Sequence, residues 1–202
     1  MSPEYANKYK ELSGKVLSKD TKFIKITKTF DPATNNYKVT IAEESENQAM
    51  IEVENAKNSV SATGNYDYQQ NSWIKLETWL SSLGGGGEYL YKTSFTWLTQ
   101  PLENIGEYIA TGYGTNTSVI SGSEYLQVTY NRQDVILQGY TWTWGPTYLN
   151  TDYYWTANIK SNTGYGFSFQ ICDDPTSRFS NVRGTMAFRV RPNISGAIIL
   201  DA

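Results

Sequence analysis

The chain has 202 residues, a net charge of −3, no histidine and a single cysteine. The absence of His excludes Ser-His-Asp and Cys-His catalysis, and one Cys excludes an intrachain disulfide and a Cys-rich zinc site. The small acidic charge gives no overall field that would attract nucleic acid or an anionic membrane. A chain of this length buries roughly 70% of the surface of its unfolded form, so it needs neither a metal nor a disulfide for stability.

Residues that favour strands dominate the composition, with 16 Tyr, 6 Trp and 7 Phe, and 16 Gly are available for turns. This balance predicts an all-β fold. The longest apolar run is far shorter than the ~20 residues that span a bilayer as a helix, so we expect no transmembrane segment.

A helical pattern is confined to the start of the chain. Apolar side chains recur at helical spacing up to Val16, Ser2 is a suitable N-cap, and Gly14 is suited to ending a helix. We therefore expect a helical segment at residues 1–20, followed by a β-sandwich domain at residues 21–202.

Period-two alternation follows the helical segment. Residues 24–26 and 37–41 alternate apolar and polar side chains around a turn at residues 31–36, which predicts a hairpin. The same alternation at residues 49–53 predicts a third strand. All of the Trp and Arg residues come after residue 58, so a subdivision near that point is one possibility.

Nine further strands are predicted, with Gly, Asn and Ser between them. They are Trp73–Leu80, Glu88–Leu98, Ile105–Thr111, Glu124–Tyr130, Val135–Trp144, Tyr153–Ile159, Tyr165–Ile171, Thr185–Val190 and Ala197–Leu200. Short strands at such regular spacing are typical of sandwiches and jelly rolls. We expect a jelly-roll-like antiparallel β-sandwich with a short N-terminal helix.

The stretch from Gln138 to Ile159 holds the densest group of aromatic residues. Flat rings stack on the apolar faces of sugars while amides, carboxylates and hydroxyls bind sugar hydroxyls, and no titrating residue is required. The same rings could instead pack in the core, lie at a membrane interface or form an oligomer contact. The predicted ligand-binding residues are Trp142, Trp144, Tyr148, Asn150, Asp152, Tyr153, Tyr154 and Trp155.

A glycosidase would need two carboxyl groups held ~5 to 9.5 Å apart, and no His. One region of the chain resembles the nucleophile region of the small jelly-roll xylanases, glycoside hydrolase family 11. The resemblance is carried by residues 100–102, by Gly106-Glu107-Tyr108-Ile109 and by residues 125–130. The resemblance gives Glu107 the position of the nucleophile. The chain departs from the family pattern by an insertion before Glu107, by the lack of a second Tyr after Tyr108, and by having no Glu after Glu124.

An Asp would therefore have to replace the family's acid/base Glu, and the candidates are Asp152, Asp173 and Asp174. The last two also form, with Asn181, a loop of oxygen ligands of the kind that calcium prefers. Their spacing does not match the EF-hand pattern, and Asp-Asp-Pro is common in ordinary turns. Asp173 and Asp174 are thus candidate metal ligands only, and we expect no cofactor.

The segment Ser94–Pro101, followed by Ile105-Gly106, resembles exported proteins of Gram-positive bacteria that have no assigned activity. The resemblance implies an extracellular or cell-surface location, with an export signal that the sequence does not include. We expect a non-catalytic binding or surface protein that engages a polysaccharide or cell-surface polymer through an aromatic face. The alternatives are a jelly-roll glycoside hydrolase that uses Glu107, and a self-assembling or pore-forming surface subunit.

Overall fold

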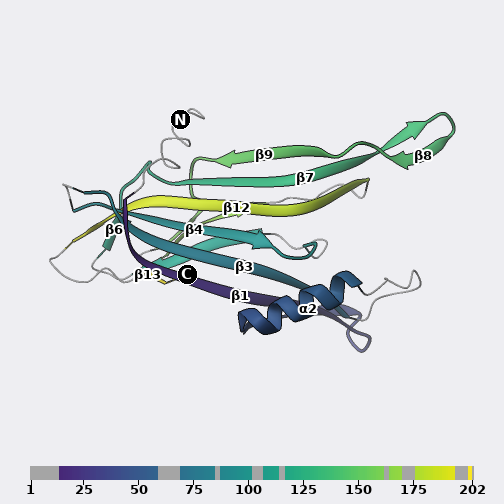
Figure 1. The fold of residues 1–202 in the computed structure, drawn as a ribbon, viewed down its shortest axis with the longest axis horizontal. Coiled ribbons are helices and arrows are strands. Elements are labelled where there is room, and N and C mark those ends of the chain that lie inside the picture. The colour runs from purple at the N-terminus through teal and green to yellow at the C-terminus, as the bar shows by residue number, and fades with distance from the viewer. Residues whose placement is uncertain are drawn as a thin grey trace.

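The computed structural model of the chain describes residues 14–58, 69–84, 87–101, 107–113, 117–161, 164–169, 176–193 and 200–201, of which 107–113 and 200–201 are described by their backbone alone. In these ranges the chain forms two antiparallel sheets and one helix, as Figure 1 shows. The predicted all-β antiparallel sandwich is confirmed.

The larger sheet has nine strands, and its order is β2-β1-β3-β4-β12-β7, with β6 beside β12 and with β8 and β9 both paired to β7. The bounds are β1 Lys15–Asp31, β2 Asn36–Glu44, β3 Gln69–Ser82, β4 Tyr89–Trp97, β6 Thr117–Val119, β7 Tyr125–Gln138, β8 Thr141–Trp144, β9 Tyr148–Tyr154 and β12 Ser177–Pro192. The predicted hairpin is β1–β2, in which Asp31 pairs with Asn36.

The smaller sheet has the order β10-β11-β5-β13. Its strands are β5 Glu107–Tyr113, β10 Ile159–Lys160, β11 Gly164–Phe169 and β13 Leu200–Asp201. Phe167 and Phe169 of β11 are buried in one cluster with Phe95, Leu126 and Phe188 of the larger sheet. Because side chains alternate across a strand, the residues next to Phe95, Leu126 and Phe188 along their strands point to the opposite, outer face of the larger sheet.

The helix α2 spans Glu46–Asn58, so the strand predicted at residues 49–53 is wrong. Ser45 caps the helix by accepting a hydrogen bond from the Gln48 amide at 3.3 Å. Ala49 and Val53 are one helical turn apart, and both are buried against Phe23 and Trp73. The strand prediction failed because two apolar residues spaced by four share one face in a helix as well as in a strand. The helix is too short and too polar to cross a membrane.

The start of the chain also departs from the prediction. Residues 15–20 belong to strand β1, so this end of the predicted helical segment is wrong, and residues 1–13 lie outside the described ranges. Glycine is needed at position 14 for a different reason from the predicted end of a helix. A Cβ at this position would lie 2.0 Å from the carbonyl oxygen of Ser82, so only glycine permits this close approach to the end of β3.

Candidate functional site

The outer face of the larger sheet carries a band of polar side chains across its middle strands. Leu126 and Val128 of β7 point into the core, so Gln127 and Thr129 point outward. The strand register then places one outward residue from each strand in a continuous row. From β3 to β9 this row is Glu77, Ser94, Thr185, Gln127 and Tyr153.

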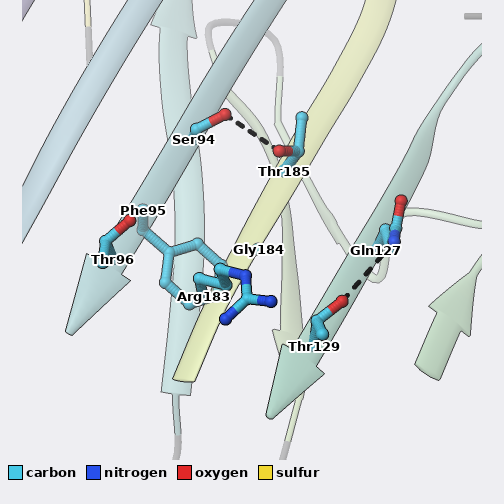
Figure 2. Close-up of a pocket in the computed structure, with 8 residues that line it drawn as sticks. All are labelled: Ser94, Phe95, Thr96, Gln127, Thr129, Arg183, Gly184 and Thr185. Carbon is cyan, nitrogen blue, oxygen red and sulfur yellow. Dashed lines mark hydrogen bonds between the residues drawn. The ribbon is translucent and has the colours of Figure 1, made fainter. Parts of the chain in front are cut away.

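A shallow pocket of about 250 Å³ opens on this face over β4, β12 and β7. We call it the outer-face pocket, and Figure 2 shows its lining, which is Ser94, Phe95, Thr96, Gln127, Thr129, Arg183, Gly184 and Thr185. The hydroxyls of Ser94 and Thr185 share a hydrogen bond of 2.9 Å, and those of Thr129 and Thr151 share one of 3.3 Å. The pocket therefore offers hydroxyl, amide and guanidinium groups side by side.

Gly184 forms the floor of the pocket. A Cβ there would lie 2.4 Å from the ring of Phe95, which is its partner across the β4–β12 ladder, and 2.7 Å from the carbonyl oxygen of Gln127. The Phe95 ring belongs to the buried core. Glycine is required here because the core ring fills the space that any side chain would take.

A pair of stacked rings borders the pocket. The rings of Tyr153 and Trp155 have centroids 5.6 Å apart and an interplanar angle of 5°. Trp155 packs on the buried outer-face cluster that contains Tyr125, while Tyr153 is 37% exposed. Tyr153 pairs with Gln127 across the β7–β9 ladder, so the ring pair and the outer-face pocket are continuous.

A third ring lies on the same face at the other side of the pocket. Trp79 of β3 is half-buried, and the ammonium groups of Lys19 and Lys92 lie 5.5 Å and 5.2 Å from its centroid. Four strand spacings separate β3 from β9, or about 19 Å at ~4.8 Å per strand. Rings thus bound the polar band at both ends.

Four of the predicted ligand-binding residues point the other way from β9. Tyr154 packs on Phe169, with centroids 6.1 Å apart, and burial raises the pKa of its hydroxyl. Asp152 accepts a hydrogen bond of 2.8 Å from Tyr130, and burial together with this bond raises the pKa of Tyr130 to about 12. Asn150 and Tyr148 share the parity of Asp152 along the strand. The structure thus separates these four from Tyr153 and Trp155.

The remaining two predicted residues, Trp142 and Trp144, lie on a different element. Val135–Trp144 is not one strand, as predicted, because β7 ends at Gln138 and turns through Gly139 and Tyr140 into β8. Gly139 has a φ of 66°, which a two-residue turn with glycine first requires. The two Trp residues therefore lie on a hairpin, and Arg178 covers the Trp144 ring at 3.7 Å.

The candidates for catalysis and metal binding fall largely outside the described part of the chain. The backbone of Glu107 begins β5 and pairs with Phe169, while its side chain lies outside that part, so its role stays a prediction. Asp173 and Asp174 also lie outside it. Among the residues that the structure does describe, no group of three or more His, Cys, Asp and Glu could hold a metal ion.

Glu124 is a buried carboxylate that the sequence analysis did not single out. Its Oε1 accepts hydrogen bonds from Tyr165 at 2.9 Å and from Lys160 at 3.3 Å, which joins the smaller sheet to the larger one. Burial opposes ionisation, but hydrogen bonds from the backbone, Tyr165 and Lys160 outweigh it and hold the pKa of Glu124 below its ordinary value. The arrangement is a structural anchor between the sheets.

Sequence reasoning also missed the polar residues of the outer-face pocket. The available signal was the alternation of Gln127 and Thr129 with buried apolar residues on β7. The sequence alone did not show that β4, β12 and β7 are neighbours in the sheet.

No family model, curated protein or solved structure matches the chain.

Proposed function

We propose that the protein is exported and binds a polysaccharide, or another cell-surface polymer, on the outer face of its larger sheet. The observation that carries this proposal is the continuity of the parallel Tyr153–Trp155 pair with the outer-face pocket. Flat rings bind the apolar face of a sugar, and the pocket supplies donors and acceptors for its hydroxyls.

The chemistry of the pocket favours a hydroxylated ligand. Its polar groups are three hydroxyl-bearing threonines, Ser94, the Gln127 amide and the Arg183 guanidinium. Glu77, the carboxylate in the same row, accepts from Lys19 at 3.2 Å and from Lys75 at 3.3 Å. Although burial opposes ionisation of Glu77, the two lysines hold its pKa below the ordinary value. The charge of Glu77 is therefore paired within the sheet.

The shape of the site favours a polymer over a single sugar. The pocket is shallow, and its polar band runs across strands from β9 toward Trp79 of β3. An extended chain that crosses the strands would contact rings at both ends, whereas a monosaccharide would contact one. Binding of this kind requires no titrating group and no cofactor.

The test is a glycan array together with pull-down of the wild-type protein by insoluble polysaccharides. We expect retention by at least one polysaccharide, and competition by soluble oligosaccharides that becomes stronger as their length increases. No retention on any polysaccharide would remove the proposal. If a monosaccharide competes with retention as strongly as an oligosaccharide does, the proposal that the ligand is a polymer is wrong.

A further inference from the structure

A second surface, distinct from the outer face, is formed by the hairpin of β7 and β8, residues 135–144, which we call the hairpin tip. Figure 1 shows it projecting beyond the rest of the larger sheet at one end of the molecule. Its large side chains face solvent, with exposed fractions of 104% for Tyr140, 68% for Trp142 and 56% for Leu137. So many exposed large apolar groups on one short hairpin indicate a contact surface.

The hairpin tip has two unlike faces. Leu137 pairs with Trp142, and Val135 pairs with Trp144, so these four side chains share one face. The other face carries the pairs Ile136–Thr143 and Gln138–Thr141. The turn at Gly139 places Tyr140 at the extreme end. The hairpin tip is therefore amphipathic, with an aromatic and aliphatic side and a mostly hydroxyl and amide side.

Charge is absent from the hairpin tip and present at its base. Residues 135–151 contain no charged side chain. At the base, Arg132 donates to Asp134 at 2.7 Å, and the guanidinium of Arg178 lies 3.7 Å from the centroid of the Trp144 ring. The charge of Arg132 is thus paired with that of Asp134, and Arg178 is the cation that lies against the end of the aromatic region.

We propose that the hairpin tip inserts into the boundary between the headgroups and the acyl chains of a lipid bilayer. Trp and Tyr prefer this boundary because their rings are apolar and their N–H and O–H groups need polar partners. The hairpin tip is a convex projection. A lipid surface can accept it without a preformed pocket, whereas a protein partner would have to provide a pocket of matching shape. Arg178 would then lie at the level of the lipid phosphates, where long cationic side chains are favoured.

The length of the hairpin tip sets the depth of insertion. Its four cross-strand pairs extend about 14 Å at ~3.4 Å per residue. A strand that spans a bilayer needs ~9–11 residues, so the hairpin tip reaches the interface and the outermost acyl chains of one leaflet. The protein as a whole has a net charge of −3, so the rings, and not a long-range field, drive this association.

The experiment measures flotation of the full chain with vesicles of phosphatidylcholine, and with vesicles of equimolar phosphatidylcholine and phosphatidylglycerol. We expect the wild type to float with both, and no more strongly with the anionic vesicles. The double substitution Tyr140→Ser and Trp142→Ser should weaken partitioning by about tenfold or more, given the apolar area that leaves water. Tyr37→Ser, at an exposed ring of β2, is the matched control and should float as the wild type does.

A second measurement does not depend on a variant that folds. Phosphatidylcholine brominated on its acyl chains should quench the tryptophan fluorescence of the wild type, because Trp142 would lie at the acyl boundary. Failure of the wild type to float, flotation restricted to anionic vesicles, or unchanged flotation of the double variant would overturn the proposal. So would a wild type that self-associates without vesicles and loses this association on double substitution, because the hairpin tip would then bind a second copy.

Discussion

Tyr153 and Trp155 stack with centroids 5.6 Å apart and ring planes within 5° of parallel. They are two residues apart, so both point to the outer face, where Trp155 packs on Tyr125 and Tyr153 remains exposed. The packing of Trp155 holds the Tyr153 ring in one orientation before any ligand arrives. A binding group that is already ordered loses less conformational entropy on binding, which favours affinity.

Tyr153→Ala should weaken polysaccharide binding by about 1–3 kcal/mol, the range found when a stacking ring is removed. The thermal midpoint should change little, because Tyr153 is exposed. Titration of the polysaccharide identified by pull-down measures the first quantity, and thermal unfolding measures the second. Tyr148→Ala is the matched control, since it removes the same side chain from the opposite side of β9. Equal losses of affinity in both variants would contradict the assignment of the site.

Trp155→Ala should behave differently, because Trp155 packs on buried residues of the outer face. We expect it to weaken binding and also to lower the free energy of unfolding by about 2–4 kcal/mol, as loss of a large, partly buried side chain that packs on a buried cluster does. Denaturant unfolding of Trp155→Ala beside Tyr153→Ala checks the difference. A Trp155→Ala protein as stable as the wild type would show that Tyr153 is not held in place by a packed ring.

Alternation in the sequence predicted most strands. On β7, for example, buried Leu126 and Val128 point to the inner face of the sheet and alternate with Gln127 and Thr129, which point to the outer face. The same rule failed at Ala49 and Val53, whose spacing of four also fits a helix, and Ser45 as an N-cap was the missed signal. It failed again at Gly139, where a two-residue turn interrupts apparently continuous alternation.

The candidate site was predicted only in part. Tyr153 and Trp155 both belong to the predicted set, but a continuous aromatic stretch gives no sign of which rings point to which face. Residue parity on β9 decides this, and parity requires the strand boundary at Tyr148. The outer-face pocket could not be predicted, because Ser94, Gln127 and Arg183 are brought together by a strand order that joins distant segments.

Gly184→Ala should destabilise the protein by about 1–3 kcal/mol, the usual cost of overpacking a close contact. The added Cβ would meet the Phe95 ring at 2.4 Å and the carbonyl oxygen of Gln127 at 2.7 Å, so the strands or the ring must move. Ser94→Ala, beside Gly184 in the same pocket, is the control and should cost less. If chemical denaturation finds Gly184→Ala as stable as the wild type, the close approach of Phe95 does not exist in solution.

Glu107 carries the alternative of a glycoside hydrolase, and its test is independent of polysaccharide binding. If that alternative holds, the wild type releases reducing sugars from xylan or β-glucan, and Glu107→Gln abolishes the release while its circular dichroism spectrum and thermal midpoint are unchanged. Glu43→Gln, at an exposed carboxylate of β2, is the control and should keep full activity. Absence of release by the wild type across a broad polysaccharide panel would remove Glu107 as a catalytic residue.

Stability should be nearly independent of pH from about 5 to 8 and should fall in acid. No His is present to titrate in that range. The shifted carboxyl pKa values of Glu52, Glu88, Glu124 and Asp134 all lie below their ordinary values. A carboxyl whose folded pKa is depressed stabilises the fold above its unfolded pKa, which is about 4.3 for Glu and about 3.9 for Asp, and this stability is lost as the pH falls through the folded pKa.

Glu124 should make the largest single contribution to this acid loss, because its side chain is 4% exposed and its Oε1 joins Tyr165 and Lys160. Glu124→Gln keeps the shape and removes the charge, so it should cost about 1–3 kcal/mol at pH 7. The gap between variant and wild type should narrow as the pH falls below the ordinary pKa of a glutamate and through the lowered pKa of Glu124, because the wild-type side chain then becomes neutral like the glutamine. Thermal midpoints of both proteins between pH 3 and pH 8 measure this gap, and Glu43→Gln serves as the exposed control. A gap that stays constant down to pH 3 would show that the charge of Glu124 adds no stability. A wild-type midpoint that falls as the pH rises from 6 to 8 would reveal a carboxyl with a raised pKa, because the folded state would then hold that proton more tightly than the unfolded state, and Glu107 is the first carboxyl to examine.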